Sequence, residues 1–234
     1  MKPPLFLLHF SGGNKYSYQF LKEHLEPHFE LHPLELPGRG ARIAEPFLTD
    51  LNQAADDLVE QILQDLDRRP FYLYGHSLGA TTGLLATQRL EARGRPPRHL
   101  IVSGNPGPCP EAKGRHRYSN GLSEAGFIES RREMGGLPDE LLANRELLDF
   151  ILPILRADFR LFTDAPTTYP PIQTPIDVIM GDREQLVGMI DNWRHLTTGT
   201  FRSTVLEGHH FFIYERVAEL SAAILTTLSL REVY

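Results

Sequence analysis

The sequence predicts an α/β fold with a mostly parallel central sheet and helices on both faces. Two observations carry this prediction. Strand-like and helix-like segments alternate along the chain, and some strand-like runs, such as residues 5–10 and 71–74, are short and mostly apolar. The 234 residues, of which 41% are hydrophobic, are enough for a single domain of this class. We therefore expect one domain over residues 1–234.

The first 66 residues supply four of these elements. Residues 5–10 read as a buried strand, and residues 16–25 as a helix that ends near Pro27. A strand at 29–36 is stopped by the Pro-Gly pair that follows it. Residues 50–66 carry apolar side chains at spacings of three and four, which predicts a helix, with Thr49 or Asp50 as its N-cap.

The later elements continue the alternation. The remaining strands are expected at 71–74, 99–103, 174–180 and 200–206, and the remaining core helices at 80–90, 191–196 and 214–228.

Residues 105–172 interrupt this rhythm between two core strands. Three prolines in residues 105–110 exclude regular structure there, and helices are expected at 123–134, 139–143 and 145–161. Segments inserted between core strands lie above the edge of the sheet, where functional sites gather. We expect a helical lid; a helical decoration that does not contact the site is the alternative.

Gly75-His76-Ser77-Leu78-Gly79 lies between a predicted strand and a predicted helix. A G-x-S-x-G segment in that position is typical of the nucleophile elbow of an α/β-hydrolase, in which a strained turn projects the serine above the sheet. Ser77 is therefore the candidate nucleophile. The N–H of Leu78, at the start of the helix, is a candidate oxyanion donor.

In this fold an acid and then a histidine follow the serine along the chain. His209 and His210 come directly after the last predicted strand, where a loop can return to the serine. The other downstream histidines are expected to be structural or solvated: His99, His116 and His195. Adjacent histidines rarely chelate one ion, and no second ligand spacing accompanies them, so we expect no metal site.

The acid is expected after the strand at 174–180. Asp182 and Glu184 both follow it, and either carboxylate could orient the imidazole and stabilise its charged form. The loop after the first strand contains Ser11 and two glycines, which let the backbone approach a ligand closely. The N–H of Ser11 is the second candidate oxyanion donor. The rival interpretation, a phosphate-binding loop, is disfavoured because no Gly-Lys-Ser/Thr follows.

The overall composition excludes several function classes. A net charge of −6 and a pI near 5.9 argue against a general nucleic-acid binder. No apolar run approaches the ~20 residues that span a bilayer, and the apolar part of residues 1–10 is too short for a signal peptide. The single cysteine, Cys109, cannot form an intrachain disulfide, which suits the cytoplasm, and we expect it to be structural.

Together, several segments resemble the type II thioesterases, the stand-alone α/β-hydrolases that serve nonribosomal peptide and polyketide synthases. The resemblance covers nearly the whole chain. It is carried by Leu7–Gly13, by Leu-Pro-Gly-Arg-Gly-Ala-Arg at 36–42, by the elbow at 75–80, by Leu-Pro-Ile-Leu-Arg-Ala-Asp-Phe at 152–159, and by Gly-His-His-Phe-Phe at 208–212.

The resemblance implies which residues act. The histidine of the family directly precedes Phe-Phe, which points to His210. The family pattern Gly-Asp-x-Asp makes the second acid catalytic. That position is Glu184 here, with Asp182 as the alternative, so this chain departs from the family in residue type.

The resemblance also implies an activity. We expect a monomeric hydrolase, without cofactor, that clears acyl groups from the phosphopantetheine arm of acyl or peptidyl carrier proteins. A general acyl-thioester or carboxylester hydrolase is the alternative, and a non-catalytic carrier-binding protein is a third. Carrier proteins are typically acidic, so local basic residues are candidates for docking. These are Arg39, Arg42, Arg115, Arg117, Arg131 and Arg132.

Overall fold

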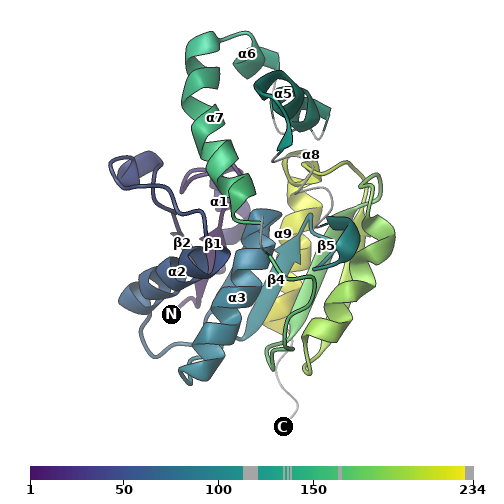
Figure 1. The fold of residues 1–234 in the computed structure, drawn as a ribbon. Coiled ribbons are helices and arrows are strands. Elements are labelled where there is room, and N and C mark those ends of the chain that lie inside the picture. Colours follow the sequence, from purple (N-terminus) through teal and green to yellow (C-terminus); the bar gives the residue numbers. More distant parts are fainter. Residues whose placement is uncertain (113–120, 134, 136, 138, 163–164, 230–234) are drawn as a thin grey trace.

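A six-stranded parallel sheet forms the centre of the molecule (Figure 1). The computed structural model describes residues 1–112, 121–133, 135, 137, 139–162 and 165–229. The strands lie in the order β2-β1-β3-β4-β5-β6, and each neighbouring pair is parallel. Their bounds are β1 Pro4–Leu8, β2 Glu30–Pro33, β3 Tyr72–His76, β4 His99–Ser103, β5 Ile176–Gly181 and β6 Phe201–Leu206. The predicted α/β architecture is confirmed, with each strand within a few residues of its expected place.

Helices follow most strands. The α-helices are α1 Lys22–Leu25, α2 Leu51–Asp65, α3 Leu78–Ala92, α5 Glu124–Glu133, α6 Asp139–Leu142, α7 Arg145–Arg160, α8 Phe212–Glu215 and α9 Val217–Ser229. Three further segments are 3-10 helices: η1 Gln19–Leu21, η2 Gly40–Arg42 and η3 Val187–Leu196. Asp50, one of the two expected caps, accepts from the N–H of Gln53 and so begins α2.

Two predicted helices differ in the structure. The helix expected at 16–25 is a 3-10 turn followed by the short α1. The helix expected at 214–228 is split into α8 and α9, because Arg216 leaves the helical region with φ −118° and ψ 45°. Both segments keep their places in the chain and pack into the same apolar core.

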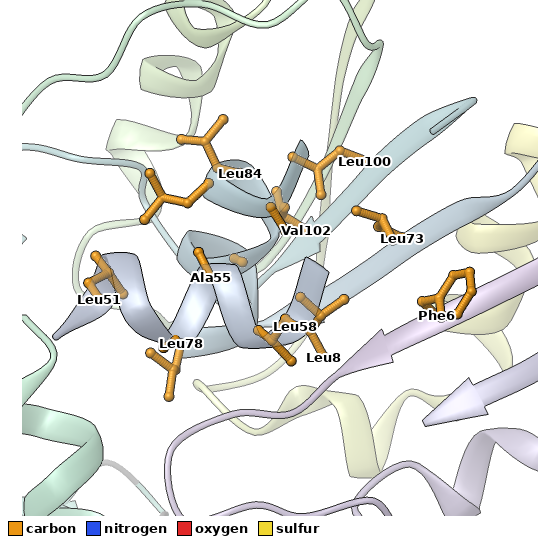
Figure 2. Packing of buried hydrophobic residues seen from close by; sticks show 14 of the residues in the cluster. Phe6, Leu8, Leu51, Ala55, Leu58, Leu73, Leu78, Leu84, Leu100 and Val102 are labelled. Carbon is orange, nitrogen blue, oxygen red and sulfur yellow. The ribbon is translucent and has the colours of Figure 1, made fainter. Parts of the chain in front are cut away.

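Alternate residues of each strand build two cores, one on each face of the sheet. Phe6 and Leu8 of β1 pack with α2, α3 and Trp193 of η3, whereas Leu5 and Leu7 pack with α1, α8 and α9. Figure 2 shows the first core, to which both Leu78 of α3 and Leu58 of α2 belong. The residue after the candidate nucleophile is therefore 1% exposed and holds the start of α3 in the core.

The segment expected to form a lid contains α5, α6 and α7. Figure 1 shows α7 rising away from the sheet, with α6 near its far end and α5 returning toward α8. These helices have a small apolar core of their own: Phe127, Leu137, Leu148, Leu152, Leu155 and Phe159. Their residues 113–120, 134, 136 and 138 lie outside the described part of the chain.

Among the residues that the structure describes, no helix combines the length and apolar character needed to cross a membrane.

Candidate active site

Ser77 occupies a strained turn between β3 and α3. Its φ of +55° is the only positive value among the described non-glycine residues. A Cβ on Gly75 would lie 2.1 Å from the carbonyl oxygen of Gly79, and a Cβ on Gly79 would lie 2.1 Å from that of Leu8. Only glycine fits these two positions, since real Cβ atoms do not approach backbone so closely. The local sequence thus dictates the geometry that the G-x-S-x-G pattern predicted.

His210 lies between Ser77 and Glu184. Its Nε2 is 3.1 Å from the Oγ of Ser77, and its Nδ1 is 2.9 Å from the Oε2 of Glu184. When Nδ1 carries the ring proton and donates a hydrogen bond to the carboxylate, Nε2 is unprotonated and can accept the hydroxyl proton of Ser77. The side chains of His210 and Glu184 are 15% and 7% exposed, so this hydrogen-bonded chain is largely shielded from water. The structure therefore brings three predicted residues together in the order serine, histidine, carboxylate.

The turn after β5 decides which carboxylate meets the histidine. The N–H of Glu184 donates to the carbonyl of Gly181, which closes the turn and folds the Glu184 side chain back. Its Oε1 accepts from the N–H of Gly181 over 2.9 Å. Asp182 instead points to the backbone: its Oδ1 accepts from the N–H of Gly208 over 2.8 Å, and its side chain is half exposed. The alternative acid is thus not beside His210.

The loops that carry the acid and the histidine are joined to each other. Asp182 donates its N–H to the carbonyl of Leu206, and Arg183 donates its N–H to the carbonyl of Gly208. A Cβ on Gly181 would lie 2.4 Å from the carbonyl oxygen of Gly208. The backbones after β5 and β6 are therefore in direct contact, and this contact sets the spacing between Glu184 and His210.

The other histidines lie elsewhere. His209 and His195 are exposed, and His116 is outside the described residues. His99 is buried at the start of β4, and its Nδ1 pairs with Asp177 over 2.8 Å. Within the described ranges, no group of three His, Cys, Asp or Glu side chains is arranged to hold a metal ion.

The loop after β1 approaches the site with one N–H unused. Gly12 donates its N–H to Asp158 over 2.7 Å, and Gly13 donates its N–H to the carbonyl of Phe10. For Ser11, no acceptor of the backbone N–H is found among the described residues. Leu78 opens α3, where the first N–H groups have no acceptor within the helix. Both candidate oxyanion donors thus remain available to a ligand.

A buried polar layer supports the site from below. The Nδ1 of His76 lies 2.9 Å from the Oγ of Ser103, which in turn lies 2.8 Å from the hydroxyl of Tyr74. The ring of His76 is 4.9 Å from that of His210. Burial, and then the neighbouring His210, lower the pKa of His76 well below its usual value. His76 is therefore an uncharged support, although sequence reasoning gave it no role.

Asn105 is a second residue that sequence reasoning missed. Its Nδ2 donates to the carbonyl of Ser77 over 2.9 Å. The backbone carbonyl of Asn105 accepts from the indole N–H of Trp193 over 2.8 Å. The available signal was a polar side chain two residues after a buried strand that is adjacent to the elbow strand. The prolines at 106, 108 and 110 predict irregular backbone there, which gives no sign of this contact.

Of the four docking arginines that the structure describes, three are buried or paired with carboxylates. Arg39 and Arg131 are 3% and 5% exposed, so their assignment to an exposed basic surface was wrong. Arg39 forms a bidentate pair with Asp158, and Arg42 pairs with Asp57 and Glu45. The guanidinium of Arg131 lies 4.0 Å from the ring centre of Phe159. Of the other candidates, Arg132 is exposed, and Arg115 and Arg117 lie outside the described residues.

Cys109 is buried, as expected for a structural thiol. Its Sγ lies 3.9 Å from the Sδ of Met189. Burial raises the pKa of this thiol, which disfavours the reactive thiolate.

Comparison with known proteins points to one family. The family model described as "Thioesterase domain" matches residues 3–228. Linear gramicidin dehydrogenase LgrE of Brevibacillus parabrevis is 33% identical, over 96% of this chain and 87% of its own. Gramicidin S biosynthesis protein GrsT of Aneurinibacillus migulanus is 31% identical, over 92% and 85% of the two chains.

The solved structures agree with that family. YbtT, described as a type II thioesterase from the yersiniabactin NRPS/PKS biosynthetic pathway, has a TM-score of 0.85 and 27% identity, covering 97% of this chain and 92% of its own. Although one relative is named a dehydrogenase, both the family match and this solved structure are thioesterases.

Proposed function

Because the chain belongs to the thioesterase domain family, we propose that Ser77, His210 and Glu184 are the catalytic triad of a type II thioesterase. Its substrate is an acyl group held as a thioester on the phosphopantetheine arm of a carrier protein. The observation that carries this proposal is the hydrogen-bonded chain from Ser77 Oγ through His210 to the Glu184 carboxylate.

The first half of the reaction acylates the serine. His210 Nε2 takes the proton of Ser77 as its Oγ attacks the thioester carbonyl carbon. The N–H groups of Ser11 and Leu78 stabilise the resulting oxyanion. When the C–S bond breaks, His210 returns the proton to the leaving thiolate, which departs as the free pantetheine thiol.

The second half restores the enzyme. His210 removes a proton from water, whose oxygen attacks the acyl-serine carbonyl. The second tetrahedral intermediate collapses, the C–O bond to Ser77 breaks, and His210 returns a proton to Oγ. Glu184 holds the imidazole in one tautomer and stabilises its positive charge in both halves.

In this proposal α5, α6 and α7 form the lid over the acyl chain. Their separate apolar core supports the idea, because α5, α6 and α7 pack on one another, while Asp158 anchors the C-terminal end of α7 to the rest of the domain. We also propose that the enzyme acts as a monomer in the cytoplasm, where its single cysteine stays reduced.

Serine-directed labelling tests the catalytic proposal. A fluorophosphonate probe is expected to label the wild-type protein and not Ser77→Ala. Equal labelling of the two proteins, or none of the wild type, rejects catalysis by Ser77 and favours a non-catalytic carrier-binding protein.

Substrate comparison tests the choice of thioester. The wild type is expected to hydrolyse an acyl-carrier thioester faster than a free ester of the same acyl group. Equal or faster hydrolysis of the free ester favours a general acyl hydrolase with the same triad.

A further inference from the structure

A buried ion pair links the long helix α7 to the loop that carries Ser11. Arg39 Nη2 lies 2.6 Å from Asp158 Oδ1, and Arg39 Nη1 lies 2.8 Å from Asp158 Oδ2. The two side chains are 3% and 1% exposed. Asp158 Oδ2 also accepts a hydrogen bond from the N–H of Gly12 over 2.7 Å, so the ion pair contacts the backbone next to Ser11.

We propose that Asp158 is a positioning residue for the oxyanion loop, defined as residues 11–13, and that Arg39 cancels its charge so that an oxyanion can form nearby. The inference rests on the proposed function and deepens it, since it assigns a role to two residues outside the triad.

The first part of the argument concerns geometry. By accepting the N–H of Gly12, Asp158 fixes the peptide that joins Ser11 to Gly12 and leaves the N–H of Ser11 for a ligand. Arg39 also donates to the carbonyl of Gly13 over 3.3 Å. Leu155, one turn before Asp158 on α7, packs against the same loop: a Cβ on Gly12 would lie 2.7 Å from its Cδ2. One face of α7 therefore holds this loop by both polar and apolar contacts.

The second part concerns charge. A buried carboxylate beside the site where negative charge develops would oppose the reaction, because charges interact strongly where water is excluded. A bidentate guanidinium removes this opposition while leaving the carboxylate oxygen on Gly12. The pair is therefore asymmetric. Loss of Arg39 leaves the negative charge of Asp158, which opposes the oxyanion. Loss of the Asp158 charge leaves the positive charge of Arg39, which favours the oxyanion.

Five variants test this asymmetry by steady-state hydrolysis of a soluble acyl thioester, with thermal unfolding measured alongside. They are Asp158→Ala, Asp158→Asn, Arg39→Gln, the double variant Arg39→Gln/Asp158→Asn, and Asp57→Ala. The last is a matched control, because Asp57 also forms a bidentate pair with an arginine of the same segment, Arg42, away from the oxyanion loop.

Asp158→Ala is expected to lower kcat by about tenfold or more with little change in KM, since it frees the loop that supplies one oxyanion donor. Asp158→Asn keeps an oxygen for Gly12 and is expected to lose less. Arg39→Gln is expected to lose more kcat than Asp158→Asn, and the double variant to recover part of that loss. Asp57→Ala is expected to lower the unfolding temperature but not kcat.

Equal kcat losses in Asp158→Ala and Asp57→Ala would overturn the positioning role. An Arg39→Gln enzyme more active than Asp158→Asn would overturn the charge argument. If Asp158→Ala does not fold, the order of Asp158→Asn, Arg39→Gln and the double variant decides the same question. A wild type that hydrolyses no thioester would instead reject the function on which the inference rests.

Discussion

The side-chain amide of Asn105 donates to the carbonyl of Ser77 over 2.9 Å, from the segment that follows the neighbouring strand β4. Ser77 has a backbone conformation that costs energy, and its neighbours must hold it there. Asn105 is in turn held by Trp193, whose indole N–H donates to the backbone carbonyl of Asn105. The backbone of Ser77 is therefore held by residues beyond its own five-residue motif.

We predict that Asn105→Asp slows the enzyme without unfolding it. Aspartate keeps the oxygen that accepts from Gly107, but it replaces the donor to Ser77 with a second oxygen, which repels the Ser77 carbonyl. The expected result is a loss of about tenfold in kcat, because small displacements of a reacting group are costly. Steady-state kinetics and the initial rate of fluorophosphonate labelling measure it.

Thr81→Val provides the control for Asn105. The Oγ1 of Thr81 is the second acceptor of the Asn105 Nδ2, at 3.0 Å, and valine keeps the shape of threonine. This variant is expected to retain nearly the wild-type labelling rate. If Asn105→Asp also retains it, Asn105 has no positioning role.

The two carboxylates after β5 are predicted to differ sharply in importance. Glu184→Ala removes the partner of His210 and is expected to lower kcat roughly 10⁴-fold, as for the loss of other triad acids. Asp182→Ala removes only a contact with the N–H of Gly208 and is expected to change kcat by no more than a few-fold. Turnover of the two variants on one thioester compares them, and the reverse order would make Asp182 the acid.

Gly79 is predicted to tolerate no side chain. In Gly79→Ala the new Cβ would lie 2.1 Å from the carbonyl oxygen of Leu8, and backbone cannot yield as a flexible side chain does. The free energy of unfolding is expected to fall by at least about 3 kcal/mol, which denaturant titration measures.

Gly83→Ala on the same helix is the comparison for Gly79. There the nearest atom is the Cδ1 of Leu100 at 3.1 Å, which can move. Its unfolding free energy is expected to stay within about 1 kcal/mol of the wild type, since alanine also favours the helix. Similar losses at both positions would refute the steric explanation.

His9 is predicted to make the protein less stable in mild acid. Its burial, and then the charge of Arg39, lower its pKa from 6.5 to about 4. Between these values the unfolded chain binds a proton that the folded chain does not, so the stability falls as the pH falls from about 6.5 to about 4. From pH 7 to pH 5 this one group is expected to remove about 2 kcal/mol.

Denaturant titrations of the wild type and His9→Gln at pH 7 and pH 5 measure this contribution. The wild type is expected to lose more stability between the two pH values than His9→Gln does. His24→Gln, at an exposed position, is the matched control. Parallel losses in the wild type and His9→Gln would show that His9 is not protonated on unfolding.

Local pattern was enough to predict most of the fold. The strand at 99–103 and the helix α2 appear almost as expected, because apolar runs and apolar stripes report directly on burial. Ser77 and His210 could also be placed, since each lies in a short motif whose neighbours fix its backbone.

The remaining features depend on contacts between distant parts of the chain. Arg39 looks like a surface charge in the sequence, and only the fold reveals Asp158, 119 residues away, as its partner. Asp182 and Glu184 are equivalent in a linear pattern, and only the turn after β5 places Glu184 beside His210 and Asp182 on the N–H of Gly208. Asn105 was missed for the same reason, because its partner Ser77 is on another strand–helix turn.

The joined loops after β5 and β6 also limit how this enzyme can be recombined with its relatives. A chimaera that takes residues 181–184 from one parent and residues 207–210 from another would mismatch two backbones that are in direct contact. If the other parent has an aspartate at position 184, the longer side chain of Glu184 would also not fit that parent's histidine loop. The two segments therefore have to come from the same parent, and an active chimaera must contain both.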